Sequence, residues 1–220
     1  MTRPAPDVVR LREDQIEIAG AMLARAFLRD PLAVYMLPDG SERARLLQGH
    51  FSPFVKYGCL VGEVHTTMLL EGVAVWLPPG CGDTTPERAA QAGLDKAPAA
   101  IGEAPWRRFA AAMDYLAAAH TRAVPVPHWY LPLLGVETTR QGHGVGTALL
   151  QTVLVRADAA GHPCYLETFE PTNVPFYERH GFETVSNGHE PTSGLSYWAM
   201  RRAPPAAGLG SREHESRRTR

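Results

Sequence analysis

The stretch Arg140-Gln141-Gly142-His143-Gly144-Val145-Gly146-Thr147 lies between an apolar extended run, residues 128–136, and a helical pattern, residues 147–160. Its three glycines stand at alternate positions. Glycine accepts a positive φ and has no Cβ, so the backbone of such a loop can pass close to a ligand. The N–H groups of the loop point outward, and the following helix adds positive dipole at its first turn. The stretch therefore predicts an anion site, for phosphate or pyrophosphate.

Two common phosphate loops do not match this stretch. A dinucleotide fingerprint would need glycine at position 147, which is threonine, and a Walker loop would need a lysine after its last glycine. The spacing that remains is Gln-x-x-Gly-x-Gly, at Gln141, Gly144 and Gly146. It resembles the pyrophosphate loop of the GNAT family of acetyl-CoA-dependent N-acetyltransferases. Taken alone, the spacing also fits a tight strand-to-helix connection.

A second block follows in the order that this family has. An extended run, residues 164–168, precedes Asn173, a short helix with Tyr177, and Gly181-Phe182 at the start of another strand. With Asp30-Pro31 and the strand at 128–136, the block resembles the puromycin N-acetyltransferase branch. The close resemblance covers about residues 128–185. The chain departs from that branch in much of residues 81–125, which leaves puromycin open as the substrate.

The resemblance implies the GNAT fold, an α/β (α+β) architecture. Its central sheet is mixed, mostly antiparallel, flanked by helices and contains a splayed strand pair. A chain of 220 residues is long enough for one such domain. We expect a loose N-terminus over residues 1–7, the acetyltransferase domain over 8–202 and a disordered tail over 203–220. Pro132 lies within the central strand, and proline is tolerated at the β-bulge that the resemblance implies there.

Apolar periodicity predicts the helices that precede this block. In the second helix Phe51 and Phe54 lie on the apolar side, and in the third Phe109 and Met113 face inward. Residues 81–104 are rich in Ala, Gly and Pro and give no clear pattern. The predicted elements are strands at 8–11, 62–68 and 72–77, and helices at 15–28 (capped by Asp14), 42–57 (capped by Ser41) and 106–122.

The resemblance also implies how acetyl-CoA is held. Main-chain groups of Leu134, Gly135 and Val136 would pair with the pantetheine arm, and the Val136 N–H would donate to the thioester carbonyl. Asn173 would reach the pantetheine amides, although an asparagine here also suits a turn or a helix cap. The loop residues Gln141, Gly142, His143, Gly144, Val145, Gly146 and Thr147 would hold the pyrophosphate, with His143 acting through its backbone.

Two residues are expected to move protons. Tyr177 would protonate the leaving sulfur, with packing under the sheet as its alternative role. Glu167 would be the general base, and a structural hydrogen bond or an ion pair with Arg179 or His180 remains its alternative. Asp30 and Tyr35, in the first connection, would bind a cationic amine. No metal is expected, because the three cysteines show no metal-ligand spacing.

The sequence thus predicts an N-acetyltransferase that acts by direct transfer in a ternary complex. The acceptor would be a primary amine of a small molecule, antibiotic or aminonucleoside-like. A protein or peptide N-acetyltransferase and a non-catalytic acyl-CoA-binding sensor remain alternatives, and a longer acyl group stays open. The net charge of −1 gives no sign of a nucleic-acid or anionic-membrane partner.

The rest of the composition bears on location. No apolar run approaches the roughly 20 residues of a membrane span, and the first residues lack a secretory signal. We therefore expect a cytoplasmic protein, monomeric or homodimeric. The excess of arginine over lysine points to a GC-rich bacterial genome.

Overall fold

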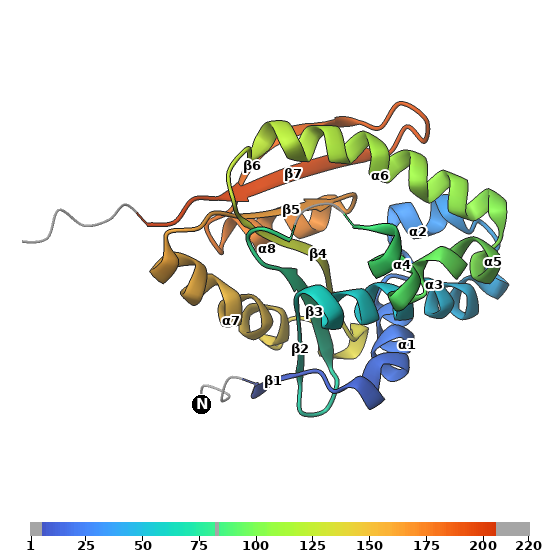
Figure 1. The fold of residues 1–220 in the computed structure, drawn as a ribbon, viewed down its shortest axis with the longest axis horizontal. Coiled ribbons are helices and arrows are strands. Elements are labelled where there is room, and N and C mark those ends of the chain that lie inside the picture. Colours follow the sequence, from blue (N-terminus) through green and yellow to red (C-terminus); the bar gives the residue numbers. More distant parts are fainter. Residues whose placement is uncertain (1–5, 82–83, 206–220) are drawn as a thin grey trace, which may run out of the picture.

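A computed structural model of the chain describes residues 6–81 and 84–205 (Figure 1). Seven strands form one sheet in the order β1-β2-β3-β4-β5-β7-β6, and only β4 and β5 run parallel. This mixed, mostly antiparallel sheet flanked by helices confirms the predicted fold class. Its strands are β1 (Val8–Arg10), β2 (Glu63–Thr67), β3 (Gly72–Leu77), β4 (Trp129–Val136), β5 (Cys164–Thr168), β6 (Glu183–His189) and β7 (Ser196–Arg202).

Eight α-helices and four 3-10 turns are found among the described residues. The α-helices are α1 (Ile16–Ala26), α2 (Pro31–Met36), α3 (Gly40–Val61), α4 (Pro86–Ala92), α5 (Ala97–Ile101), α6 (Glu103–Ala123), α7 (Val145–Ala160) and α8 (Val174–Glu178). The 3-10 turns are η1 (Glu13–Gln15), η2 (Leu94–Lys96), η3 (Thr138–Arg140) and η4 (Pro171–Asn173). Within residues 6–81 and 84–205, no helix has both the length and the apolar content needed to cross a bilayer.

The sheet separates two layers of helices. Helices α7 and α8 cover one face, where Trp76, Leu166 and Met200 are buried. On the other face, α1 and α3 pack over β2 to β4, and α6 runs along β7 and β6 (Figure 1). Helices α3 and α6 therefore lie on the same face of the sheet, away from α7 and α8.

The N-terminal helices differ from the prediction in their ends. Helix α1 begins at Ile16 after a 3-10 turn, so Asp14 is not its cap; the Asp14 carboxylate accepts from Arg12 Nε at 3.0 Å. Helix α3 is capped by Asp39, which accepts from the Ser41 N–H at 2.9 Å, so Ser41 is not the cap. A neighbouring carboxylate took the cap position that the pattern had assigned to serine.

A further helix, α2, lies where the sequence predicted only a break. Helix α1 already ends at Ala26, and the Asp30 carboxylate accepts from the N–H groups of Leu32 and Ala33, at 2.9 and 3.3 Å. Pro31 stands at the first helical position, where its missing N–H costs nothing. The Asp-Pro pair therefore starts α2, and α1 ends four residues before Asp30.

Strand β4 contains a β-bulge at Pro132. The pairing with β3 shifts between Val75↔Leu133 and Leu77↔Tyr130, so that one extra residue of β4 opposes Trp76. The two residues Leu131 and Leu134, three apart, both pack on the α7 side. Unbroken alternation would bring residues two or four apart to the same face. The bulge thus shifts the alternation of β4 by one residue, at the proline that the sequence singled out.

The tails and one loop lie outside the described residues. The first strand begins at Val8 and the last ends at Arg202. Most of the expected loose N-terminus (residues 1–5) and most of the expected tail (residues 206–220) fall in the undescribed parts of the chain. Residues 81–104, which gave no pattern, contain two short helices, α4 and α5.

Candidate active site

The site begins where β4 and β5 separate. Their parallel pairing covers only Trp129↔Cys164 and Tyr130↔Tyr165. Beyond Tyr130 the β5-facing edge of β4 has no strand partner among the described residues. On the other edge the Glu137 N–H donates to the Glu71 carbonyl at 2.8 Å. Because backbone groups alternate between the two edges, the N–H and C=O of Leu134 and Val136 face the gap between the strands.

Gly135 lies between these two residues, directly against α1. A Cβ at Gly135 would come within 2.6 Å of Leu23 Cδ2 and 3.1 Å of Phe27 Cε2. Helix α1 can therefore pack this closely on β4 only because position 135 has no side chain. The predicted backbone residues 134–136 are thereby held at a fixed place in the gap.

The glycine loop lies at the N-terminus of α7, close to the end of β4. Gly144 is the N-cap with φ +81°, no side chain caps the helix, and a Cβ at Gly144 would meet nothing within 4 Å. The Ala148 N–H donates to the Gly144 carbonyl at 2.9 Å, so the N–H groups of Val145, Gly146 and Thr147 have no intrahelical acceptor. An open, uncapped helix N-terminus of this kind favours an anion.

Other predicted residues of this region make contacts within the protein. Gln141 Nε2 donates to the Val136 carbonyl at 3.3 Å, so the loop is joined to the end of β4. Asn173 Nδ2 donates to Thr168 Oγ1 at 3.3 Å, which places Asn173 beside the end of β5. The ring of His143 bonds through Nδ1 to the Gln141 carbonyl at 2.8 Å, within its own loop.

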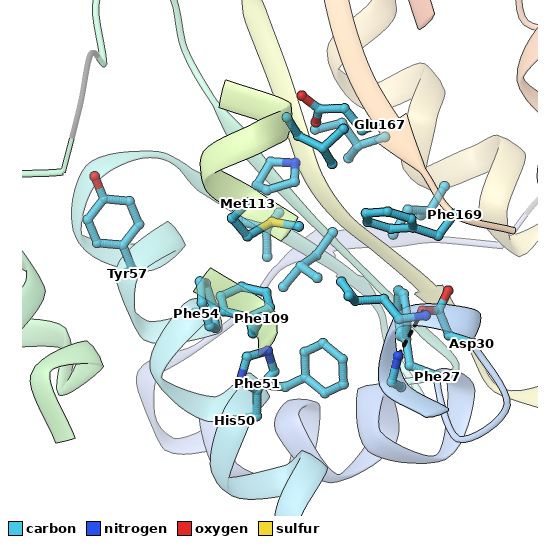
Figure 2. Close-up of a pocket in the computed structure, with 18 of the residues that line it drawn as sticks. Phe27, Asp30, His50, Phe51, Phe54, Tyr57, Phe109, Met113, Glu167 and Phe169 are labelled. Atoms are coloured by element: carbon cyan, nitrogen blue, oxygen red, sulfur yellow. Dashed lines mark hydrogen bonds between the residues drawn. The ribbon is translucent and has the colours of Figure 1, made fainter. Parts of the chain in front are cut away.

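A cavity of about 600 Å³ opens beside the gap between β4 and β5, on the α6 side of the sheet (Figure 2). Residues from β4, β5 and α8 line one part, among them Glu167 and Tyr177. Residues from α2, α3 and α6 line much of the remainder, together with a few from β3, α4 and η2, and most of them are apolar or aromatic. Both residues that the sequence assigned to proton transfer therefore line the same cavity. It also includes the predicted binding residue Asp30.

Tyr177 is 6% exposed and lines this cavity. Burial first, and then the nearby Asp30 carboxylate, raise the pKa of Tyr177, so the hydroxyl keeps its proton at neutral pH. Burial also raises the pKa of Asp30 to about 6, although its cap hydrogen bonds oppose the shift. The geometry therefore provides a protonated phenol beside a carboxylate that titrates below neutral pH.

Glu167 has a side chain that is 7% exposed. Burial raises its pKa to about 7, and the phenol groups of Tyr130 and Tyr165 lower it in part. The Tyr165 hydroxyl is itself buried without a hydrogen bond of good geometry to any described residue. A carboxyl group that titrates near neutral pH can both accept and release a proton in each reaction cycle.

The partner of Glu167 is a histidine that the sequence did not single out. His120 Nδ1 on α6 lies 3.7 Å from Glu167 Oε1, and its ring stacks on Tyr165 with centroids 4.1 Å apart. The predicted alternative partner His180 instead bonds to the Phe176 carbonyl and to Thr147 Oγ1. The sequence feature that could have indicated this residue is its position in the last turn of α6, close to the sheet.

His120 in turn contacts His128, which the sequence analysis gave no role. Their Nε2 atoms are 2.7 Å apart, and His128 Nδ1 is 2.7 Å from the Val126 carbonyl. Since a carbonyl only accepts, Nδ1 of neutral His128 carries the hydrogen and its Nε2 accepts from His120. The remaining lone pair, on His120 Nδ1, then faces Glu167. The three side chains form one row from the buried carboxyl group to the partly exposed His128.

Two predictions for the acceptor site concern positions on or near α2. Asp30 lines the cavity. Tyr35 is not among the lining residues, and its ring lies against Arg108, whose Cζ is 6.0 Å from the ring centroid. Among the described residues, no group of three or more His, Cys, Asp or Glu side chains is arranged to hold a metal ion.

Comparisons with known proteins agree with this geometry. Residues 108–184 match the family model described as acetyltransferase (GNAT) domain. An uncharacterized N-acetyltransferase of Schizosaccharomyces pombe is 28% identical over 181 residues, which cover 79% of this chain and 72% of the relative. The part of this chain that matches the family model contains β4, the glycine loop, Glu167 and Tyr177.

Solved structures share the fold. One, from Corynebacterium glutamicum, is described as histone acetyltransferase HPA2 and related acetyltransferase. It is 20% identical, with a TM-score of 0.64 over 94% of this chain and 100% of that one. The polyamine N-acetyltransferase of Drosophila melanogaster is 16% identical, with a TM-score of 0.55 over 90% of this chain and 100% of that one.

Proposed function

We propose that this enzyme, an acyltransferase with a GNAT acetyltransferase domain, transfers an acetyl group from acetyl-CoA to the primary amine of a small molecule. The observation that carries the proposal is the cavity of about 600 Å³ that contains Glu167 and Tyr177. Its volume lies within the usual range of small-molecule sites, and α2, α3 and α6 line it. A peptide acceptor would need an open groove along the sheet instead.

The chain has suitable groups for acetyl-CoA. The free edge of β4 at Leu134 and Val136 would hold the pantetheine arm, and the uncapped N-terminus of α7 would hold the pyrophosphate. Asn173, beside the end of β5, would contact the pantetheine amides. When bound, acetyl-CoA supplies the thioester whose acetyl group is transferred.

Gly144→Glu is expected to weaken acetyl-CoA binding by at least about tenfold, because it puts a carboxylate at a helix N-terminus that favours anions. Gly161→Glu is the matched control. Gly161 caps the other end of α7 with φ +69°, and a Cβ there also meets nothing within 4 Å. Both variants put a glutamate at a glycine with positive φ and add the same charge. Calorimetry should show weakened binding only for Gly144→Glu, and equal affinities in both folded variants would contradict this site.

The residues of the cavity would handle protons as follows. Glu167 takes a proton from the bound ammonium group and leaves a neutral amine that can attack. The Val136 N–H donates to the oxygen on which negative charge develops. The Tyr177 hydroxyl then gives its proton to the departing sulfur, and the second proton that the nitrogen loses as the amide forms returns to the Tyr177 oxygen. Each role needs only the groups that the cavity and the β4 edge present.

His120 and His128 would clear the proton from Glu167. The proton enters His120 at Nδ1 while the hydrogen on His120 Nε2 passes to His128 Nε2. His128 becomes a cation and releases a proton to water at the partly exposed end of the row. Burial, and then the charge of His128, lower the pKa of His120 to about 4, so His120 passes the proton on and does not store it.

His120→Phe tests this relay, because the phenyl ring can keep the stack on Tyr165 while both nitrogens are lost. We expect kcat/KM to fall about tenfold, at the low end of general acid–base effects, and added imidazole to restore part of the rate. His162→Phe, on the turn after α7, is the control; its kcat/KM should equal that of the native protein, and imidazole should have no effect on it. Normal kinetics in the His120 variant would leave it only a packing role.

One assay decides the proposed function. Acetyl-CoA-dependent thiol release would be measured with aminonucleosides, polyamines and peptides as acceptors. Turnover of a small amine with no turnover of peptides supports the proposal, and turnover of peptides alone overturns it. We include puromycin in the panel, since the branch that the sequence resembles acts on it. The same assay would test a role in antibiotic resistance.

A further inference from the structure

The part of the cavity away from the sheet is built from aromatic rings. His50 on α3 has its ring centroid 4.7 Å from Phe109 and 4.9 Å from Phe54, and those two rings are 5.5 Å apart. Trp106 is 5.5 Å from Phe109. All four line the cavity. Figure 2 shows His50 and Phe109 at the end opposite Glu167. We call this end the aromatic chamber.

One polar group in the aromatic chamber has no partner in the protein. His50 is 3% exposed, and its Nδ1 atom forms no hydrogen bond with any described residue. Burial lowers the pKa of His50 to about 4, so the ring is neutral at pH 7. A buried polar atom without a partner is unfavourable, and such atoms are rare in folded proteins. Because His50 lines the cavity, a group bound there that reaches Nδ1 would complete its hydrogen bond.

The carboxylates that line the cavity come from elements other than α3 and α6. Three carboxylates line it: Glu167 and Asp30 near the sheet, and the exposed Asp95 on η2. The lining residues from α3 and α6 include no acid; they are Leu47, His50, Phe51, Phe54, Tyr57, Trp106, Phe109, Met113 and Leu116. A second ammonium group on the acceptor would lose its hydration among these rings without gaining a counter-charge from α3 or α6.

We infer that the acceptor is a monoamine with an aromatic or bulky apolar body and one neutral hydrogen-bonding group, such as a hydroxyl, distant from the amine. The ammonium end lies between Glu167 and Asp30, the body fills the aromatic chamber, and the neutral group bonds to His50. A neutral imidazole has one donor and one acceptor, so it suits a hydroxyl in either direction. This inference rests on the proposed function and specifies its substrate class.

The test compares matched amines as acceptors with acetyl-CoA. Phenylalkylamines with two to four methylenes, each with and without a para-hydroxyl, are set against spermidine and agmatine. We expect the best phenylalkylamine to exceed both polyamines in kcat/KM by at least about tenfold. We also expect a hydroxyl preference of about tenfold at one chain length, because a buried polar group left unpaired discriminates strongly.

Variants at His50 connect that preference to the chamber. His50→Phe should abolish the hydroxyl preference, and His50→Gln, which retains a donor and an acceptor, should restore part of it. His189→Phe makes the same change at an exposed position of β6 and should keep the preference. If His50→Phe does not fold, His50→Gln alone should still show a reduced preference. An unchanged preference in the folded His50 variants would overturn the assignment of His50.

The remaining outcomes separate this inference from the proposed function. Faster turnover of spermidine or agmatine would overturn the substrate class while acetyl transfer to a small amine stood. A preference for hexanoyl-CoA over acetyl-CoA would put an acyl chain in the chamber and overturn it as well. If no amine is acetylated, calorimetry with the same amine pairs tests whether the cavity binds the inferred class of amine. Tighter binding of the hydroxylated member, lost in His50→Phe, would support the class although the proposed function failed, and no difference would overturn both.

Discussion

Glu167→Gln is expected to lower kcat/KM by about 10²–10⁴-fold and to flatten its dependence on pH near neutrality. The native carboxyl group has a pKa raised to about 7 by burial, so the base form, and with it the rate, should increase as the pH rises through 7. Glutamine keeps the shape of the side chain but has no titrating group. The measurement is kcat/KM against pH from 5.5 to 9 with one amine whose own titration is known.

Stability gives an independent check on the same group. Because the pKa of Glu167 is raised in the folded protein, the native state holds this proton between about pH 4.5 and 7 while the unfolded chain has lost it. The contribution of Glu167 to stability therefore falls as the pH rises through that window. Glu167→Gln should raise Tm relative to the native protein at pH 8 more than at pH 4.5. Glu183→Gln, at an exposed position of β6, is the control and should change neither the pH dependence of Tm nor that of kcat/KM. An unaltered pH–rate profile in Glu167→Gln would assign the base to another group.

Tyr177→Phe is expected to lower kcat by about 10²–10⁴-fold if the chemical step limits turnover. The ring is 6% exposed and packs with Phe176 and Phe182, so phenylalanine should keep the packing and remove only the hydroxyl. Single-turnover measurements isolate the chemical step from product release. The Tm of the variant should be nearly that of the native protein, and this result would distinguish loss of a proton donor from damage to the core.

Tyr115→Phe is a suitable control for this variant. Tyr115 lies on α6 against Tyr197, with ring centroids 5.6 Å apart, and it does not line the cavity. It loses the same hydroxyl at a position without a proposed role. Full single-turnover activity in Tyr177→Phe would leave that residue with packing alone.

The elements that carry the proposed cofactor residues were well predicted from the sequence, because they depend on local residues. The glycine loop, the strand at 164–168 and the short helix with Tyr177 each follow from neighbouring residues. The strand Cys164–Thr168 was predicted to the residue. Helix α7 begins at Val145, two residues before the predicted start. The uncapped N-terminus of α7 follows from the glycine itself, which needs no distant contact.

The acceptor half could be predicted only in part. Apolar periodicity correctly predicted which side chains of α3 and α6 face inward, among them Phe54 and Phe109. Periodicity cannot tell whether two inward faces touch each other or leave a cavity between them, because the separation of the helices is set by tertiary packing. His50 and His120 were missed for the same reason, since each acquires its surroundings from residues far away in the sequence. Asp30 was chosen for its charge, and its role as the cap of α2 was not foreseen.

The bulge at Pro132 divides β4 into two segments, and this determines which changes in the length of the strand keep its side chains on their faces. Before the bulge Trp129 and Leu131 pack toward α7; after it Leu134 and Val136 do. Loss of Pro132 would leave the remaining residues in regular alternation, so Leu134 and Val136 would keep their face and Gly135 would still lie against α1. Insertion of one residue after the bulge would instead direct a side chain at α1, where only Gly135 now fits. Strand β4 should therefore tolerate loss of the bulged residue better than an insertion in its second segment.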